Sequence, residues 1–143
     1  SWEELTRSAP LAADHVGPTT EDLAILQYTS GTTGSPKGVR LTHRNLLANA
    51  AQARAWVPEI VRGEGCVVYA VLPLFHAYGL TLCLTFAMSM GARLVLFPRF
   101  DPSLVLAVTK KRPATFLPLV PPIADRLLSA AASAGVSLEG TQV

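Results

Sequence analysis

The chain has 143 residues, of which half are hydrophobic and 15% are charged. This composition supplies enough apolar material for the core of one domain, and it excludes intrinsic disorder, which requires low hydrophobicity and high net charge. The formal net charge of +2 is far short of the clustered basic face of a nucleic-acid-binding protein.

Charge is unevenly distributed along the chain. Residues 1–22 carry five acids and one arginine, a net charge of −4, whereas the remainder carries eleven Lys or Arg and five acids, a net charge of +6. Because residues 1–22 are also rich in Ala, Pro and Thr and lack periodicity, we expect a linker or lead-in segment there. The mildly basic body over 23–143 suits an anionic ligand such as a nucleotide.

The start of the sequence, its two cysteines and one uncharged stretch indicate which targeting, redox and membrane features to expect. It opens without an initiator Met, a basic n-region or an apolar h-region, so we expect a piece of a longer protein and no signal peptide. Cys66 and Cys83 show no metal-ligand spacing, and we interpret them as buried reduced thiols of a cytoplasmic protein, with peripheral membrane association left open. The uncharged stretch 65–92 is interrupted by Pro73 and Gly79, which argues against a transmembrane span.

The first predicted elements form a hairpin and a helix. Residues 23–29 and 38–42 read as strands, and the polar loop 30–37 joins them. Thr42 is a good N-cap residue, so we expect a helix over 43–56.

From residue 66 onward, predicted strands and helices alternate. The expected elements, beginning with a strand, are 66–72, 77–90, 93–97, 102–111, 114–120 and 121–132. Such alternation predicts a parallel sheet with right-handed crossovers and helices packed on it. The predicted fold class is therefore α/β, in which a β-hairpin carrying the polar loop is followed by a parallel, Rossmann-like βαβαβα unit.

The loop of the hairpin collects groups that bind phosphate. Hydroxyls donate hydrogen bonds to phosphate oxygens, glycines let the backbone approach closely, and lysine adds a mobile positive charge. The residues that supply these properties are Thr29, Ser30, Gly31, Thr32, Thr33, Gly34 and Lys37.

This loop is not a Walker P-loop. That motif needs G-x-x-x-x-G-K-[ST] followed by a helix, whereas here Gly31 and Gly34 lie three residues apart and Lys37 precedes a predicted strand. From composition alone, a polar hairpin between two strands remains an alternative.

The string YTSGTTGSPKGV over 28–39, continued by LTHRN over 41–45, closely resembles the phosphate-binding signature of the adenylate-forming superfamily. This superfamily includes acyl-CoA synthetases, aryl-CoA ligases, luciferases and peptide-synthetase adenylation domains. The resemblance implies that 23–143 is part of an N-terminal AMP-binding domain, truncated at its C-terminal end. It also implies that the loop binds phosphate and that Lys37 steers or neutralises pyrophosphate.

A second motif, LPLFHAYG over 72–79, lies where a predicted strand ends and a helix begins, which is where ligands bind in open α/β sheets. A lone His at such a place is by itself more often a core residue. The octapeptide, however, resembles the second signature of the same superfamily, which implies that His76 lies beside the carboxylate and the adenylate. Peptide-synthetase relatives usually carry Phe-Asp where this chain has Phe75-His76, which favours an acid without an α-amine.

The resemblance implies a two-step reaction. A carboxylic acid, for which the apolar setting favours a fatty acid, attacks the α-phosphate of ATP to give acyl-AMP and pyrophosphate. The thiol of coenzyme A, or of a carrier protein, then displaces AMP. Mg²⁺ is expected to assist the first step. Residues 120–122, VPP, resemble a segment at the mouth of the acid pocket, and a helix start is the open alternative.

Three parts of the superfamily pattern are absent from this sequence. They are the Tyr-Gly-x-Thr-Glu stretch whose Glu holds the metal, the Asp that binds the ribose, and the lysine of the C-terminal domain that drives adenylation. We therefore expect no metal ligand in this chain and no activity of the chain alone. The alternatives are a non-catalytic nucleotide-binding module and an unrelated phosphotransferase.

Overall fold

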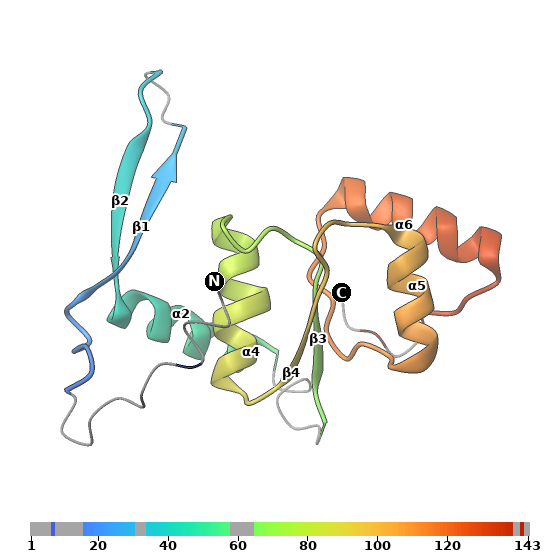
Figure 1. The fold of residues 1–143 in the computed structure, drawn as a ribbon, viewed down its shortest axis with the longest axis horizontal. Coiled ribbons are helices and arrows are strands. Elements are labelled where there is room, and N and C mark those ends of the chain that lie inside the picture. Colours follow the sequence, from blue (N-terminus) through green and yellow to red (C-terminus); the bar gives the residue numbers. More distant parts are fainter. Residues whose placement is uncertain (1–6, 8–15, 31–33, 58–64, 139–140, 142–143) are drawn as a thin grey trace.

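The fold was analysed in a computed structural model, which describes residues 7, 16–30, 34–57, 65–138 and 141. An antiparallel hairpin comes first and projects beyond the helices (Figure 1). It is formed by β1 (Leu23–Thr29) and β2 (Lys37–Thr42), which pair in a register that sets Thr29 opposite Lys37. The two predicted strands are confirmed, with β2 beginning one residue earlier than expected.

The first long helix, α2 (His43–Trp56), begins directly after β2. Thr42 is its N-cap, as predicted. The Thr42 hydroxyl accepts a hydrogen bond from the Asn45 N–H at 3.4 Å, and Asn45 Oδ1 accepts one from the Thr42 N–H at 2.9 Å. This reciprocal capping box satisfies two backbone donors at the start of the helix.

A parallel pair of strands forms the centre of the chain. β3 (Val67–Ala70) pairs with β4 (Arg93–Leu96), and the crossover between them contains η1 (Gly79–Thr85) and α4 (Phe86–Ser89). The prediction of parallel pairing is confirmed, but both strands are shorter than expected. The single helix predicted over 77–90 is a π-helix through η1 and becomes an α-helix at α4.

The segment that follows α5 (Pro102–Lys111) corrects one prediction. A strand was expected over 114–120, but only an isolated parallel bridge between Val68 and Phe116 forms. The physical reason is Pro118, which has no N–H with which to continue a ladder. Helix α6 (Pro121–Ala134) then starts close to its predicted position and ends at Gly135, which has φ of 59°.

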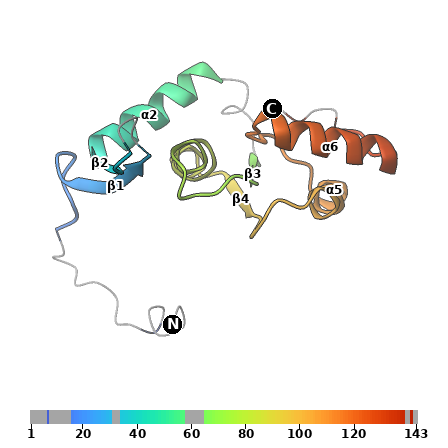
Figure 2. The same cartoon turned by 90° about the horizontal axis from the view of Figure 1, so that it is seen from above.

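Helices lie on both faces of the β3–β4 pair, with α2 and α4 on one side and α5 and α6 on the other (Figure 2). β3 is buried along its whole length. Tyr69 belongs to a core cluster with Val105 and Leu127, whereas Val68 belongs to a second cluster with Phe86. Val68 thus faces a different core from its neighbours Val67 and Tyr69, which explains why the sequence around β3 is continuously apolar. The α/β class is as predicted.

Candidate functional site

The hairpin tip presents the predicted phosphate loop. Because Thr29 and Lys37 are paired across the two strands, the loop 30–36 is closed at its base and its two ends are held side by side. Gly34 adopts φ of 86°, a conformation that side chains rarely accept, and nothing lies within 4 Å of the place where its Cβ would be. The space beside the Gly34 backbone is therefore open among the described residues.

The predicted phosphate-binding residues fall into two groups. Thr29, Ser30, Gly34 and Lys37 are exposed. The other three, Gly31, Thr32 and Thr33, lie outside the described residues. Within the described ranges no carboxylate pairs with Lys37, so its ammonium is free to meet an anion. Hydroxyls, backbone N–H groups and an ammonium form a donor set that fits phosphate.

The second motif forms a tight turn at the carboxyl end of β3. The His76 N–H donates to the Pro73 carbonyl at 3.1 Å, and the Leu80 N–H donates to the His76 carbonyl at 2.9 Å. Gly79 packs directly beneath this turn. A Cβ at position 79 would lie 2.3 Å from the Pro73 oxygen, so only glycine allows the helix to begin here.

The imidazole of His76 is oriented by its own turn. Its Nδ1 accepts a hydrogen bond from the Tyr78 N–H at 3.3 Å, and the side chain is exposed. When one ring nitrogen of a neutral imidazole accepts, the other carries the hydrogen. In the neutral ring this arrangement leaves the hydrogen on Nε2, which can donate to a carboxylate oxygen.

Gln27 connects the two motifs, and the sequence analysis did not identify it. Its Nε2 donates to the Phe75 carbonyl at 3.2 Å and to the Tyr28 carbonyl at 3.4 Å. Among the described residues, no hydrogen bond or ion pair joins His76 directly to Lys37. The structure thus brings the two motifs together through β1, by a contact between residues 48 positions apart that no local pattern reveals.

A cavity of about 440 Å³ lies between α2, the start of η1 and the segment before α6. Its walls are mainly apolar, and its lining residues are Asn49, Gln52, Ala53, Trp56, Val57, Tyr78, Leu82, Phe116 and Pro118. The α2 residues of this set were not predicted. One signal in the sequence was Trp56, a large aromatic residue at the end of an Ala-rich helix.

Tyr78 links this cavity to the start of α6. Its hydroxyl donates to the Leu119 carbonyl at 3.4 Å. Val120 is the N-cap of α6 and Pro121 its first residue, which confirms the helix-start interpretation of residues 120–122. A role of these residues at the mouth of an acid pocket stays a prediction.

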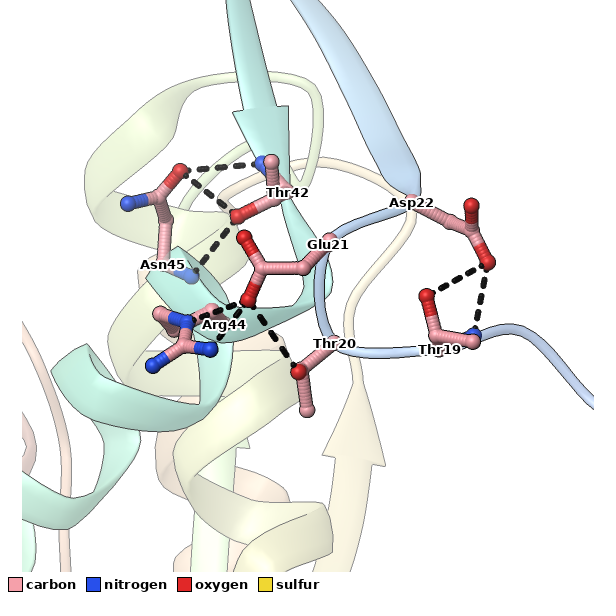
Figure 3. A network of polar contacts seen from close by, with 7 residues as sticks. All are labelled: Thr19, Thr20, Glu21, Asp22, Thr42, Arg44 and Asn45. Carbon is pink, nitrogen blue, oxygen red and sulfur yellow. Dashed lines mark hydrogen bonds and ion pairs between the residues drawn. The ribbon is translucent and has the colours of Figure 1, made fainter.

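Residues 19–22 hold the start of α2 in place (Figure 3). The His43 N–H donates to the Asp22 carbonyl at 3.1 Å, and the Arg44 N–H donates to the Thr20 carbonyl at 2.8 Å. The Arg44 side chain also pairs with Glu21, and its Nε lies 2.6 Å from Oε1. The base of the hairpin and the helix that follows it are thus joined to the preceding turn.

The turn over residues 19–22 is itself closed by Asp22. Its carboxylate accepts hydrogen bonds from the Thr19 N–H at 2.7 Å and from the Thr19 hydroxyl at 2.9 Å (Figure 3). The hydrogen bond from the Thr19 N–H, and to a lesser extent the one from the Thr19 hydroxyl, favours the charged carboxylate. The pKa of Asp22 is therefore lowered below its ordinary value.

The cysteines are buried, as predicted, and both are free thiols. Burial raises the pKa of Cys83 to about 11, so it is not a nucleophile near neutral pH. In the described part of the chain, His, Cys, Asp and Glu nowhere gather in a group of three that could hold a metal ion. No helix of the described ranges is both long and apolar enough to span a bilayer.

Comparison with known proteins adds independent evidence. The family model described as AMP-binding enzyme matches residues 1–141. A long-chain-fatty-acid–CoA ligase of Bacillus subtilis (strain 168) is 43% identical over 107 residues, which are 75% of this chain and 19% of the relative. The 4-coumarate–CoA ligase 1 of Oryza sativa subsp. japonica is 34% identical over 149 aligned positions, covering 99% of this chain and 26% of the relative.

A solved structure agrees with the fold. The inhibitor-bound N-terminal domain of FACL13 from Mycobacterium tuberculosis matches with a TM-score of 0.79 and 27% identity, over 98% of this chain and 34% of that one. This chain spans about a fifth to a quarter of the length of the two curated relatives above. The mixed α/β fold therefore corresponds to part of an N-terminal domain, and the resemblance noted in the sequence is confirmed. The chain belongs to the AMP-binding enzyme family of adenylate-forming enzymes.

Proposed function

We propose that the protein containing this chain activates a carboxylic acid with ATP and transfers the acyl group to the thiol of coenzyme A. The observation that carries the proposal is the hairpin-borne donor loop joined through Gln27 to the turn that presents His76. The CoA ligases among its relatives support this reaction class.

In this proposal the hairpin loop binds the phosphates of ATP. The hydroxyls of Thr29 and Ser30 and the backbone around Gly34 would donate hydrogen bonds to phosphate oxygens, together with Gly31, Thr32 and Thr33. Lys37 would neutralise charge on the departing pyrophosphate. In this proposal the parallel β3–β4 unit is the Rossmann-like part of the domain. The carboxyl ends of its two strands lie on the side to which the hairpin points (Figure 1).

His76 and the neighbouring cavity would hold the acid. Nε2 of His76 donates to the carboxylate, which orients it for attack on the α-phosphate. The acyl chain would enter the cavity beside Tyr78, whose apolar walls include Leu82, Phe116 and Pro118. Mg²⁺ would supply charge stabilisation at the phosphates, and its ligands are expected from the remainder of the protein.

The preferred acid is proposed to be a fatty acid. The 43% identity to a long-chain-fatty-acid–CoA ligase and the apolar cavity support it. An aryl acid is the second candidate, because the 4-coumarate–CoA ligase 1 of Oryza sativa matches over more of the chain. A cytoplasmic location, with the domain boundary near residue 22, is part of the same proposal.

Acid-dependent exchange of pyrophosphate into ATP by the full-length protein tests the reaction. We expect exchange with a long-chain fatty acid, weaker exchange with 4-coumarate, and formation of acyl-CoA when coenzyme A is added. Lys37→Ala should lower the rate of exchange by roughly 10- to 100-fold, because a charge-assisted contact is lost. Arg40→Gln, an exposed cation on the same hairpin, is the matched control and should retain the rate.

Two outcomes would redirect the proposal. ATP binding without any acid-dependent exchange favours the non-catalytic nucleotide-binding module. Phosphate transfer without release of AMP favours a phosphotransferase. We also propose that the 143-residue chain alone does not catalyse exchange, a proposal supported by the small share of each relative that it covers.

A further inference from the structure

Gln27 lies half-buried on β1, two positions before the first proposed phosphate-binding residue. Its side-chain amide contacts two backbone carbonyls, those of Tyr28 and Phe75. We propose that Gln27 is a positioning residue that fixes the phosphate loop relative to His76. This inference rests on the proposed function and adds to it a residue that keeps the ATP-binding loop aligned with the acid-binding His76.

The chemistry of the contact requires a hydrogen-bond donor at this position. Both partners are carbonyl oxygens, which can only accept hydrogen bonds, so the side chain must present donors to both. The amide of Gln27 has two N–H groups and can direct one to each carbonyl. A glutamate of the same size has no donor, and an asparagine is one methylene shorter.

The two carbonyls belong to the peptide bonds that lead directly into two residues of the proposed site, Thr29 and His76. The Tyr28 carbonyl is bonded to the nitrogen of Thr29, and the Phe75 carbonyl is bonded to the nitrogen of His76. In the described part of the chain, Gln27 supplies the hydrogen bond between the hairpin and this turn. One amide therefore contacts both peptide units and ties β1 to the turn.

Alignment of the hairpin with the turn that carries His76 should affect the rate of attack on the phosphate more than the binding of ATP or of the acid. The hairpin projects from the body of the domain (Figure 1), and the Gln27–Phe75 hydrogen bond ties its first strand to the turn that carries His76. Attack of a carboxylate on a phosphate requires a near-attack geometry, and a displacement of about 1 Å can lower the rate by roughly 100-fold. Loss of the amide should therefore lower kcat and leave the KM values for ATP and for the acid little changed.

The test measures acid-dependent ATP–pyrophosphate exchange by the full-length protein with a long-chain fatty acid. For Gln27→Glu and for the neutral Gln27→Met, we expect a fall in kcat of roughly 10-fold and changes in KM below about twofold. Rates are normalised to the concentration of ATP-binding sites, so that a partly unfolded variant does not imitate the effect. Arg40→Gln, on the neighbouring strand, is the control and should keep the wild-type kcat.

A double-mutant cycle separates positioning from a general structural role. In a His76→Ala background the loss caused by Gln27→Glu should shrink to about threefold or less, because the group being positioned is gone. An equal loss in both backgrounds, or a kcat within twofold of wild type for both Gln27 variants, would overturn the inference while the proposed function stands. Absence of acid-dependent exchange in the wild-type protein would overturn both.

Discussion

Cys83 shows at the scale of one residue how burial controls chemistry. Its side chain is fully buried in η1, and its Sγ lies 3.9 Å from the Tyr69 carbonyl oxygen. Burial disfavours the thiolate and raises the pKa of Cys83 from 9.0 to about 11. The thiol should therefore resist iodoacetamide at pH 8 in the native protein and react after unfolding in urea.

The same shift predicts how stability depends on pH. Between pH 9 and 11 the unfolded chain loses the Cys83 proton while the folded chain retains it, so the free energy of unfolding should fall across this range. The fall attributable to Cys83 is about 2–3 kcal/mol, and it is absent below pH 9.

The measurement compares urea unfolding of the wild-type protein and Cys83→Ala at pH 8 and at pH 10.5. Burial also raises the pKa of Tyr69, but both proteins contain Tyr69, so the difference between them isolates Cys83. Identical pH dependence in the two proteins would contradict the prediction.

Single residues also show how far the candidate site was predictable. Lys37 and His76 were identified because each sits inside a contiguous motif that resembles a signature of the superfamily. Gln27 was not, because its contact is with Phe75, which is close to it only after folding. The polar residues Asn49 and Gln52 were missed for the same reason, since their cavity exists only once α2 packs against η1.

At the scale of an element, α2 depends on its first turn. We predict that Thr42→Ala lowers the free energy of unfolding by about 1 kcal/mol, because the Asn45 N–H loses its side-chain acceptor. Urea unfolding measures the loss. Asn45→Ala should cause a similar loss, and the double variant should cost less than the sum, since both residues belong to one capping box.

The Arg44–Glu21 ion pair beside this cap should contribute less to the free energy of unfolding than the cap does. Arg44 and Glu21 are 67% and 66% exposed, so Glu21→Gln should cost less than about 1 kcal/mol, with the effect fading at high salt. A loss for Glu21→Gln larger than that for Thr42→Ala would contradict the ranking of cap over ion pair.

Helices were predicted more accurately than strands because their ends carry local signals. Thr42 and the pair Asp101-Pro102 set the starts of α2 and α5, and Asp101 Oδ1 accepts from the Ser103 N–H at 2.9 Å, as an N-cap should. Strand ends depend on partners elsewhere in the chain. Hence the apolar run after Pro113 resembled a strand, although Pro118 prevents more than one bridge.

At the scale of the whole molecule, the β3–β4 pair separates two cores that should contribute independently to stability. Val105 packs on the α5–α6 side and Phe86 on the α2–α4 side. We expect losses of about 2 kcal/mol for Val105→Ala and about 1 kcal/mol for Phe86→Leu. In the double variant these losses should add to within about 0.5 kcal/mol, because the two residues belong to different clusters on opposite faces of the β3–β4 pair.

A pair within one core is the matched control. The rings of Phe86 and Phe116 meet edge to face, with centroids 5.4 Å apart. Phe86→Leu and Phe116→Leu should therefore depart from additivity by about 0.5–1.5 kcal/mol in urea unfolding. Strong coupling across the sheet, or none between the two rings, would contradict the division into two cores.

The junction of residues 19–22 with α2 has an evolutionary consequence. The N–H groups of His43 and Arg44 are met by the carbonyls of Asp22 and Thr20, and a carbonyl is present whatever side chain a residue bears. The side chain at position 20 is therefore free to vary in related proteins without loss of the hydrogen bond to the Arg44 N–H, whereas at position 22 the Asp carboxylate also closes the turn. Insertions or deletions between this turn and β1, which would shift the carbonyls along the chain, should be the changes that selection removes.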